Sequence, residues 1–280
     1  MAAAKTGAWR CIACGREGAH VIPRLNYTRQ LVNRLIAIFR LAIALPILAL
    51  ATLLILLTAR LPFKRKGIGL APWLCTLCAR LSMRIFNVRF SCANPHLLWQ
   101  HRGFVFANHI GAFDILMMLH ILPCRFLSAA ETKKIPFIGQ VAEAIGTLFV
   151  DRANRKSRAE IYKQLAEAER FPALVIYPEG GVGPAHNVQP FKYGSFEICV
   201  KNQIPYLLCA IRYSQPEPLN WLKDEKFQQV LWKAAQHLGP IRAELIPLRC
   251  VQPTGDENAR ELTTQAHREI ADALGILPQQ

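Results

Sequence analysis

The chain has 280 residues, which is enough for one α/β domain and a smaller appendage. Its net charge of +15 is unevenly spread, because residues 1–90 hold 14 Lys or Arg and one acidic residue, Glu17, whereas residues 91–280 are close to balanced. A nucleic-acid-binding protein would carry the excess on its folded domain, so this distribution argues against nucleic acid and favours an anionic membrane surface.

The most apolar part of the chain is 41–59, nineteen residues without a charge. This is close to the length that spans a bilayer, and basic residues flank both ends. The 40 residues before it exceed the usual leader of a secretory signal peptide. We therefore expect a retained membrane anchor.

The range 73–88 predicts a second helix, with apolar residues at roughly helical spacing: Leu74, Leu77, Leu81, Ile85 and Val88. Arg80 and Arg84 fall on the other side, which is typical of an amphipathic helix at a membrane interface. The alternative is a helix that packs on the core. Together the two helices would form a hairpin in one leaflet, with Pro46 as a kink and the turn at Pro62 to Gly69.

Nine cysteines, an odd number at scattered positions, resemble no disulfide framework and favour a reducing compartment. Cys11, Cys14 and His20 form a candidate metal site on the amino-terminal tail, but no fourth ligand is evident. The alternative is a tail with free thiols. We divide the chain into a basic tail (1–34), a membrane-associated helical region (35–90) and a catalytic α/β domain (91–280).

After residue 90, apolar strands alternate with helices, the pattern of an α/β fold with a central sheet flanked by helices. The predicted strands are 104–107, 125–129, 147–150, 173–177, 206–211 and 242–247. The predicted helices are 114–121, 134–144, 156–170, 193–201, 227–236 and 260–273. Ligands of open α/β sheets gather beyond the carboxyl ends of the strands, so polar residues there are candidate site residues.

His109 follows the first of these strands, and Asp114 lies five residues later in the first turn of the next helix. A neutral imidazole can take a proton from an attacking hydroxyl if a carboxylate holds its other ring nitrogen and stabilises the imidazolium. This spacing predicts a catalytic base and its partner. The alternative is that Asp114 only caps the helix.

Two further strand ends carry candidate binding residues. Arg152, after the strand at 147–150, suits a phosphate clamp, although a surface ion pair is the alternative. The segment 177–184 contains Glu179 and three glycines, whose backbone N–H groups can approach a ligand and stabilise an oxyanion. Glu179 is a candidate for binding a hydroxyl or for orienting a basic side chain, and an exposed turn carboxylate is the alternative.

In this order, the segments resemble the glycerolipid acyltransferase family that includes 1-acylglycerol-3-phosphate acyltransferases. The resemblance covers roughly 88–212 and rests on these motifs: Asn108-His109 with Asp114, Phe149-Val150-Asp151-Arg152, Tyr177-Pro178-Glu179-Gly180 and Ile204-Pro205. It implies a mixed-sheet α/β domain and the transfer of an acyl group from acyl-CoA or acyl-carrier protein to a lysolipid hydroxyl. It also implies no metal cofactor, and it fits the membrane-associated helices predicted above. We expect a membrane location with the catalytic domain on the cytoplasmic face.

The resemblance implies that His109 and Asp114 are catalytic. It implies substrate-binding roles for Asn108, Arg152, Glu179, Gly180, Gly181 and Lys192. Members that act on lysophosphatidic acid continue Glu-Gly with Thr-Arg, whereas this chain has Gly181 and Val182. Arg152, Lys192 or the basic cluster at 152–158 would then bind the phosphate.

The most favoured acceptor is 1-acylglycerol-3-phosphate, and the product is phosphatidic acid. The alternatives are a choline, ethanolamine, glycerol or ornithine lysolipid, or a lipid-binding protein without activity. A hydrolase with the same His-Asp pair is disfavoured because the chain has no Gly-x-Ser-x-Gly turn.

Overall fold

A seven-stranded sheet organises the chain, of which this computed structural model describes residues 22–184, 186–222 and 224–276. The strands are β3 (Val88–Cys92), β4 (Phe104–Ala107), β5 (Arg125–Ala129), β6 (Leu148–Val150), β7 (Leu174–Ile176), β8 (Tyr206–Tyr213) and β9 (Ile241–Val251). Their order across the sheet is β3-β9-β8-β4-β7-β5-β6. The five strands from β8 to β6 run parallel, whereas β9 is antiparallel to β8 and parallel to β3. The predicted mixed α/β sheet is therefore confirmed.

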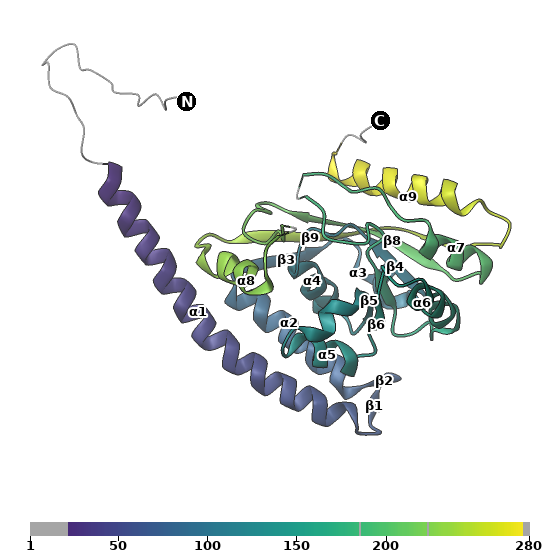
Figure 1. The fold of residues 1–280 in the computed structure, drawn as a ribbon, viewed down its shortest axis with the longest axis horizontal. Coiled ribbons are helices and arrows are strands. Elements are labelled where there is room, and N and C mark those ends of the chain that lie inside the picture. Colours follow the sequence, from purple (N-terminus) through teal and green to yellow (C-terminus); the bar gives the residue numbers. More distant parts are fainter. Residues whose placement is uncertain (1–21, 185, 223, 277–280) are drawn as a thin grey trace, which may run out of the picture.

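Helices cover both faces of this sheet (Figure 1). On one side lie α2 (Leu70–Ile85), α4 (Phe113–Ile121), α5 (Ile138–Ala144) and α8 (Phe227–Gln236), and on the other lie α6 (Arg155–Glu167), α7 (Gly194–Lys201) and α9 (Ala259–Leu274). Two short helical elements, α3 (Pro95–Gln100) and the 3-10 turn η1 (Ala130–Lys134), follow β3 and β5.

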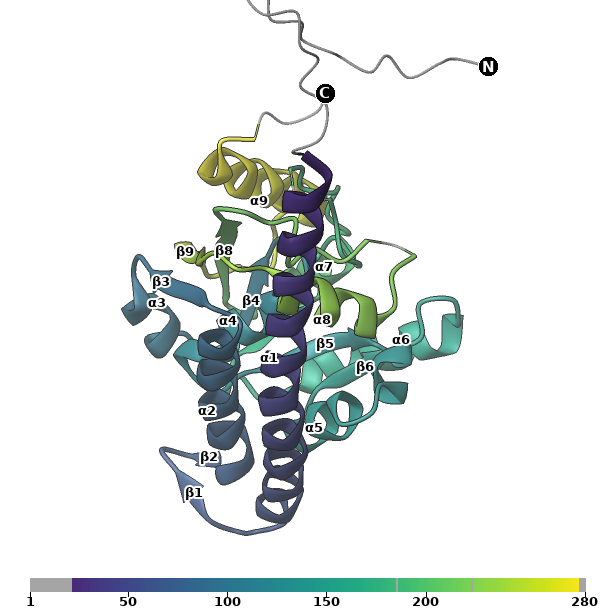
Figure 2. The same cartoon turned by 90° about the vertical axis from the view of Figure 1, so that its left-hand side faces the viewer.

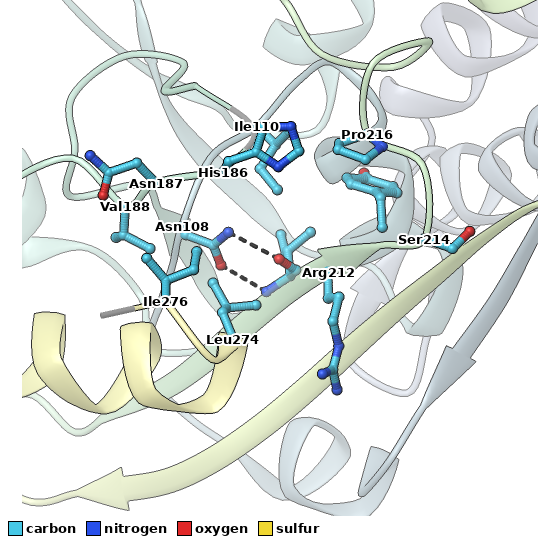
Figure 3. A pocket seen from close by; sticks show the side chains of 12 residues that line it. Asn108, Ile110, His186, Asn187, Val188, Arg212, Ser214, Pro216, Leu274 and Ile276 are labelled. Atoms are coloured by element: carbon cyan, nitrogen blue, oxygen red, sulfur yellow. Dashed lines mark hydrogen bonds between the residues drawn. The ribbon is translucent and has the colours of Figure 1, made fainter. Parts of the chain in front are cut away.

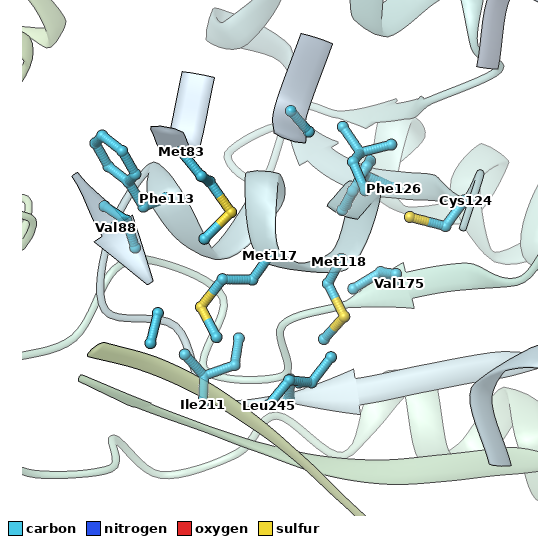
Figure 4. Close-up of a cluster of buried hydrophobic side chains, with 14 of the residues drawn as sticks. Met83, Val88, Phe113, Met117, Met118, Cys124, Phe126, Val175, Ile211 and Leu245 are labelled. Carbon is cyan, nitrogen blue, oxygen red and sulfur yellow. The ribbon is translucent and has the colours of Figure 1, made fainter. Parts of the chain in front are cut away.

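Strand β4 shows how the sequence fills both layers. Successive side chains of a strand point to opposite faces. Phe104 and Phe106 accordingly join the core under α6, α7 and α9, whereas Val105 and Ala107 join the core under α2 and α4. Figure 4 shows part of the second core. An apolar run without alternation is therefore what a strand covered on both faces requires.

Before the sheet, helix α1 (Ile22–Ala59) and α2 form the predicted hairpin, and a short ribbon joins them: β1 (Lys64–Arg65) and β2 (Ile68–Gly69). Figure 2 shows α1 beside α2. Residues 27–59 are long and apolar enough to cross a membrane by length and composition, and their most apolar 18-residue window has a mean hydropathy of 2.7. Only 17% of the most apolar window is buried, because α1 turns one face to the domain and leaves most leucines exposed.

Helix α2 packs on the core, and it does so with a face other than the apolar one that the sequence predicted for a membrane interface. Its buried apolar side chains are Ala71, Cys75, Ala79 and Met83, whereas Leu77 is 60% exposed. Three of these four residues are small, which lets α2 approach α1 and α4 closely. The apolar pattern alone could not reveal a contact face made of small residues.

Several elements depart from the predicted bounds, and β9 runs four residues beyond the predicted end at 247. Val88 begins strand β3 rather than ending a helix, so the sheet includes residues before the proposed boundary at 91. The helix predicted at 134–144 begins at Ile138, because Pro136 cannot continue a helix from Lys134. Helix α3 was not predicted. The division into domains remains a prediction, and the tail with Cys11, Cys14 and His20 lies outside the described residues.

Candidate active site

His109 and Asp114 meet at the carboxyl end of β4, where the chain turns into α4. His109 Nδ1 lies 2.7 Å from Asp114 Oδ2. Because an ionised carboxylate only accepts hydrogen bonds, the contact assigns the proton to Nδ1 and leaves Nε2 as the basic nitrogen. The imidazole also stacks on the ring of Tyr177, with 4.0 Å between ring centroids. The ring is therefore held in one orientation.

The carboxylate of Asp114 is fully buried and accepts four hydrogen bonds. Besides the imidazole, Oδ2 accepts from the backbone N–H groups of Ile110 (2.6 Å) and Gly111 (2.9 Å), and Oδ1 accepts from the hydroxyl of Tyr213 (2.7 Å). Burial raises the pKa of Tyr213 well above its ordinary value, so the hydroxyl keeps its proton and can donate. Such hydrogen bonds to the charged form offset the free-energy cost of removing a carboxylate from water.

Glu179 binds the backbone of the loop at 108–112, which carries the candidate base and is here named the catalytic loop. It does not face the cavity beside His109. Its Oε1 accepts from the N–H of His109 (2.6 Å), and its Oε2 accepts from the N–H of Gln189 (2.9 Å). Burial raises the pKa of this carboxyl to about 7, although the two N–H groups oppose the shift. Since both oxygens are used, we assign Glu179 a positioning role and not the expected contact with an acceptor hydroxyl.

Asn108 is also used within the fold. Its Nδ2 donates to the carbonyl of Ile211 (3.0 Å) and its Oδ1 accepts from the N–H of Ile211 (2.7 Å), as Figure 3 shows. The side chain thus extends the pairing of β4 with β8 by one residue. We assign it a positioning role in place of the expected substrate contact.

The glycine turn offers fewer free N–H groups than its sequence suggests. The N–H of Gly180 donates to the carbonyl of Tyr177 (3.0 Å), and the N–H of Gly183 donates to the carbonyl of His109 (2.8 Å). Within the described residues, the N–H groups of Gly181 and Val182 have no acceptor, and both residues line the cavity beside His109. They are the remaining candidates for binding an oxyanion.

Arg152 and Lys192 both lie against Gly180 of this turn, but only Arg152 lines the cavity. Arg152 lines the cavity, and its Nη1 donates to the carbonyl of Gly180. The ammonium of Lys192 lies where a β-carbon on Gly180 would project, and Gly180 has a φ of +75°, so glycine is required there. Arg152 is the only Lys or Arg among the described residues of the cavity wall.

The cavity has a volume of about 450 Å³. Its wall is mostly apolar and includes Ile115, Phe126, Tyr177, Val182, Trp221 and Leu222, with His109 and Arg152 as its basic side chains. A second cavity of about 180 Å³ lies under α1, α2 and α5 and shares Ile115, Phe126, Ser128 and Thr132 with the first. The histidine therefore lines a cavity that adjoins an apolar pocket across these four shared residues. No group of three potential metal ligands occurs in the described ranges.

Residues 89–212 match the model of the Acyltransferase family. Residues 89–212 form an acyltransferase-family domain. The match includes His109 and Asp114 and ends in strand β8, just before Tyr213.

Relatives of this domain act on different lipids by name. A lyso-ornithine lipid O-acyltransferase of Pseudomonas aeruginosa is 38% identical over 42% of this chain and 43% of that protein, so the alignment spans less than half of either. One of the same name from Rhodobacter capsulatus is 28% identical over 72% of this chain and 77% of that protein. The 1-acyl-sn-glycerol-3-phosphate acyltransferase of Escherichia coli is 25% identical over 69% and 76%.

The fold extends beyond the family-matched residues. The crystal structure of the 1-acyl-sn-glycerophosphate acyltransferase of Thermotoga maritima covers 88% of this chain, with a TM-score of 0.67 and 20% identity. At this identity the likeness concerns the fold alone. This chain thus shares a known architecture, which includes segments on both sides of the matched range.

The sequence analysis assigned no role to three residues around His109 and Asp114. Tyr213, Tyr177 and Trp221 are far from His109 in the chain but lie against the pair or its cavity. Tyr177 and Tyr213 stand at or next to the carboxyl ends of strands β7 and β8. That position was the available signal, because parallel strands beside β4 end at the same edge of the sheet.

Proposed function

We propose that this protein transfers a fatty acyl group from a thioester to the hydroxyl of a lysolipid. The observation that carries the proposal is His109, held by a buried carboxylate and lining a cavity that adjoins an apolar pocket. A base in this setting suits a hydroxyl nucleophile. The family of residues 89–212 supports the same chemistry.

In the proposed reaction, Nε2 of His109 takes the proton of the acceptor hydroxyl as its oxygen bonds to the thioester carbonyl carbon. Asp114 stabilises the imidazolium, and the N–H groups of Gly181 and Val182 bind the oxyanion of the tetrahedral intermediate. When the intermediate collapses, the carbon–sulfur bond breaks and the imidazolium returns the proton to the leaving thiolate. The protein carries no covalent acyl group at any step.

The donor's acyl chain would enter the apolar pocket under α1, α2 and α5. The thioester carbonyl must lie beside His109, and Ile115 and Phe126 line both that cavity and the apolar pocket next to it. Burying methylene groups in such a pocket is worth about 0.8 kcal/mol each. We propose acyl-CoA or acyl-carrier protein as donor and no metal or other cofactor.

The first candidate acceptor is 1-acylglycerol-3-phosphate. Arg152 would bind its phosphate at the cavity wall, and a guanidinium suits this role because its N–H groups match phosphate oxygens. Lyso-ornithine lipid is the second candidate. It is favoured because Val182 stands where members that act on lysophosphatidic acid have an arginine, and because the relative at 38% identity bears that name.

We further propose that α1 lies along one leaflet of a membrane, with the domain on the cytoplasmic side. Helix α1 packs on α2, α5 and α8, and Arg40 Nη1 donates to the carbonyls of Ala235 (3.0 Å) and His237 beside the end of α8. Crossing the bilayer would take these helices and their polar loops into hydrocarbon, which is costly. The free cysteines of the domain suit a reducing compartment.

An acceptor panel tests the proposed reaction. The purified protein would receive palmitoyl-CoA with lysophosphatidic acid, lysophosphatidylcholine or lyso-ornithine lipid, while thiol release and the diacyl product are both measured. We expect equal amounts of thiol and product with at least one acceptor. Thiol release without product would mean hydrolysis, and no reaction with CoA or acyl-carrier-protein donors would contradict the proposal.

Arg152→Ala separates the two candidate acceptors. If Arg152 binds a phosphate, KM for lysophosphatidic acid should rise about tenfold or more, which corresponds to a charge-assisted hydrogen bond. KM for lyso-ornithine lipid should change little. Equal effects on both acceptors would show that Arg152 mainly supports the turn through Gly180.

A further inference from the structure

Two apolar side chains at the main cavity come from a segment after the family-matched residues. Trp221 and Leu222 line the cavity with His109, whereas the match ends at residue 212. Leu222 is 54% exposed. An exposed leucine gains free energy when an alkyl chain covers it. These two side chains, here named the wall, therefore form an apolar surface near the reacting nitrogen.

The wall is joined directly to the catalytic loop. The N–H of Trp221 donates to the carbonyl of Ile110 (3.2 Å), the residue after His109. The carbonyl of the buried Leu219 lies so close to Gly111 that any β-carbon at position 111 would collide with it. The position of the wall relative to His109 is thus set by contacts with the adjacent residues of the loop.

An ion pair holds the segment in place. Lys233 Nζ on α8 donates to Asn220 Oδ1 and to both carboxylate oxygens of Glu225, each at 2.9 Å. Glu225 also accepts from the N–H of Leu222 (2.9 Å), and its carbonyl accepts from Trp221 Nε1 (2.8 Å). The wall is therefore formed before a substrate arrives, so binding orders few additional groups.

Two fatty chains must be accommodated in the proposed reaction. The donor's chain has the apolar pocket beyond Ile115 and Phe126. The chain already attached to the lysolipid must leave the site toward the membrane while its hydroxyl stays beside His109. Helix α8 follows the wall in the chain and packs on α1, whose outer face is rich in exposed leucines. The wall thus lies on the segment that connects the catalytic loop to the apolar anchor.

We propose that Trp221 and Leu222 contact the fatty chain carried by the acceptor lysolipid and select acceptors by the length of that chain. This inference rests on the proposed function and adds a specificity-determining surface to it. A short acyl chain would end before it covers the exposed part of Leu222. A long chain would cover it and gain affinity.

The test compares Leu222→Ser with the unaltered protein, using 1-hexadecanoyl and 1-octanoyl lysolipids of one head group, chosen as an acceptor that the unaltered protein uses. We expect KM for the hexadecanoyl acceptor to rise about fivefold, the loss of roughly half a buried leucine. KM for the octanoyl acceptor and for the thioester donor should stay within twofold. Leu222→Met should restore the preference. Leu238→Ser is the matched control, since Leu238 is 40% exposed and lies away from the cavity wall.

The outcomes separate this inference from the proposed function. If the unaltered protein acylates no lysolipid, the proposed function fails. If it acylates lysolipids but Leu222→Ser keeps the preference for the hexadecanoyl acceptor, only the wall's role is overturned. Equal losses for both acceptors would assign Leu222 to the general architecture of the site, and a changed donor KM would assign it to the donor's chain.

Discussion

Asp114 illustrates how little freedom a buried carboxylate retains once the surrounding backbone is folded. Two of its four hydrogen bonds come from backbone N–H groups, which can only donate, so rotation of the carboxylate would leave a buried donor without an acceptor. The sequence spacing predicted the imidazole contact. It could not predict the hydroxyl of Tyr213, which is 99 residues away in the chain.

Glu179 is the residue whose role changed most between sequence and structure. A carboxylate next to a glycine turn suggested contact with a ligand, yet its oxygens accept from the backbone of His109 and Gln189. Nothing in a local sequence shows which backbone N–H groups will need an acceptor after folding. Glu179 therefore connects the catalytic loop to the segment after the glycine turn.

The raised pKa of Glu179, about 7, predicts a pH dependence of stability. Because the unfolded carboxyl has a pKa of 4.5, the folded protein binds more protons between pH 4.5 and about 7. Stability should then fall as pH rises through this window, by at most about 1.4 kcal/mol per pH unit from this group. In Glu179→Gln this contribution should vanish, as measured by denaturant unfolding at several pH values. The same slope in both proteins would contradict the assignment.

At the scale of elements, the corner between β4 and α4 was predicted well because its signals are local. An apolar strand, a polar turn and an acidic first helical turn follow one another within Phe104–Asp114. The contact face of α2 was predicted poorly because Ala71, Cys75 and Ala79, although they recur every four residues, are small and less apolar than the leucines beside them. Strand β3 pairs only with β9, about 150 residues later, so no segment near it in the sequence indicates that it is a strand.

Arg40 predicts how α1 is held to the domain. Its guanidinium donates to two carbonyls beside the end of α8, a position where helices leave carbonyls unpaired and favour cations. Arg40→Met keeps the apolar stem but removes the donors, so the free energy of unfolding should fall by about 1–3 kcal/mol. Hydrogen exchange should rise in α1 and α8. Arg34→Met, at an exposed position of the same helix, is the control, and equal exchange in both variants would contradict the assigned role.

At the scale of the whole molecule, charge and apolar surface were the predictable features. The basic excess and the apolar run both fall in the first third of the chain, and the structure places an exposed apolar helix there. The sequence could not show that this helix packs along the domain, because that depends on buried positions such as Ala37, Ala51 and Ile55. These contacts are the basis for proposing one leaflet rather than a membrane span.

The exposed face of α1 predicts membrane binding. Leu50 and Leu57 are 59% and 57% exposed, and burying the exposed part of each in lipid is worth about 1–2 kcal/mol. The double variant Leu50→Glu and Leu57→Glu should bind anionic vesicles at least tenfold more weakly in a flotation assay, with unchanged thermal stability. Lys163→Glu makes the same change in net charge at an exposed position of α6. This variant should bind nearly as well as the unaltered protein. Equal weakening in both would point to charge alone.

The central claim is that His109 is the base that activates the lysolipid hydroxyl. The most direct measurement is the rate of diacyl product formation by His109→Ala, with the acceptor that the unaltered protein uses and with His96→Ala, at an exposed position, as control. We predict a loss of about 10²–10⁴ for His109→Ala, unchanged thermal stability, and full activity for His96→Ala. Retention of most of the activity by a folded His109→Ala protein would contradict the account.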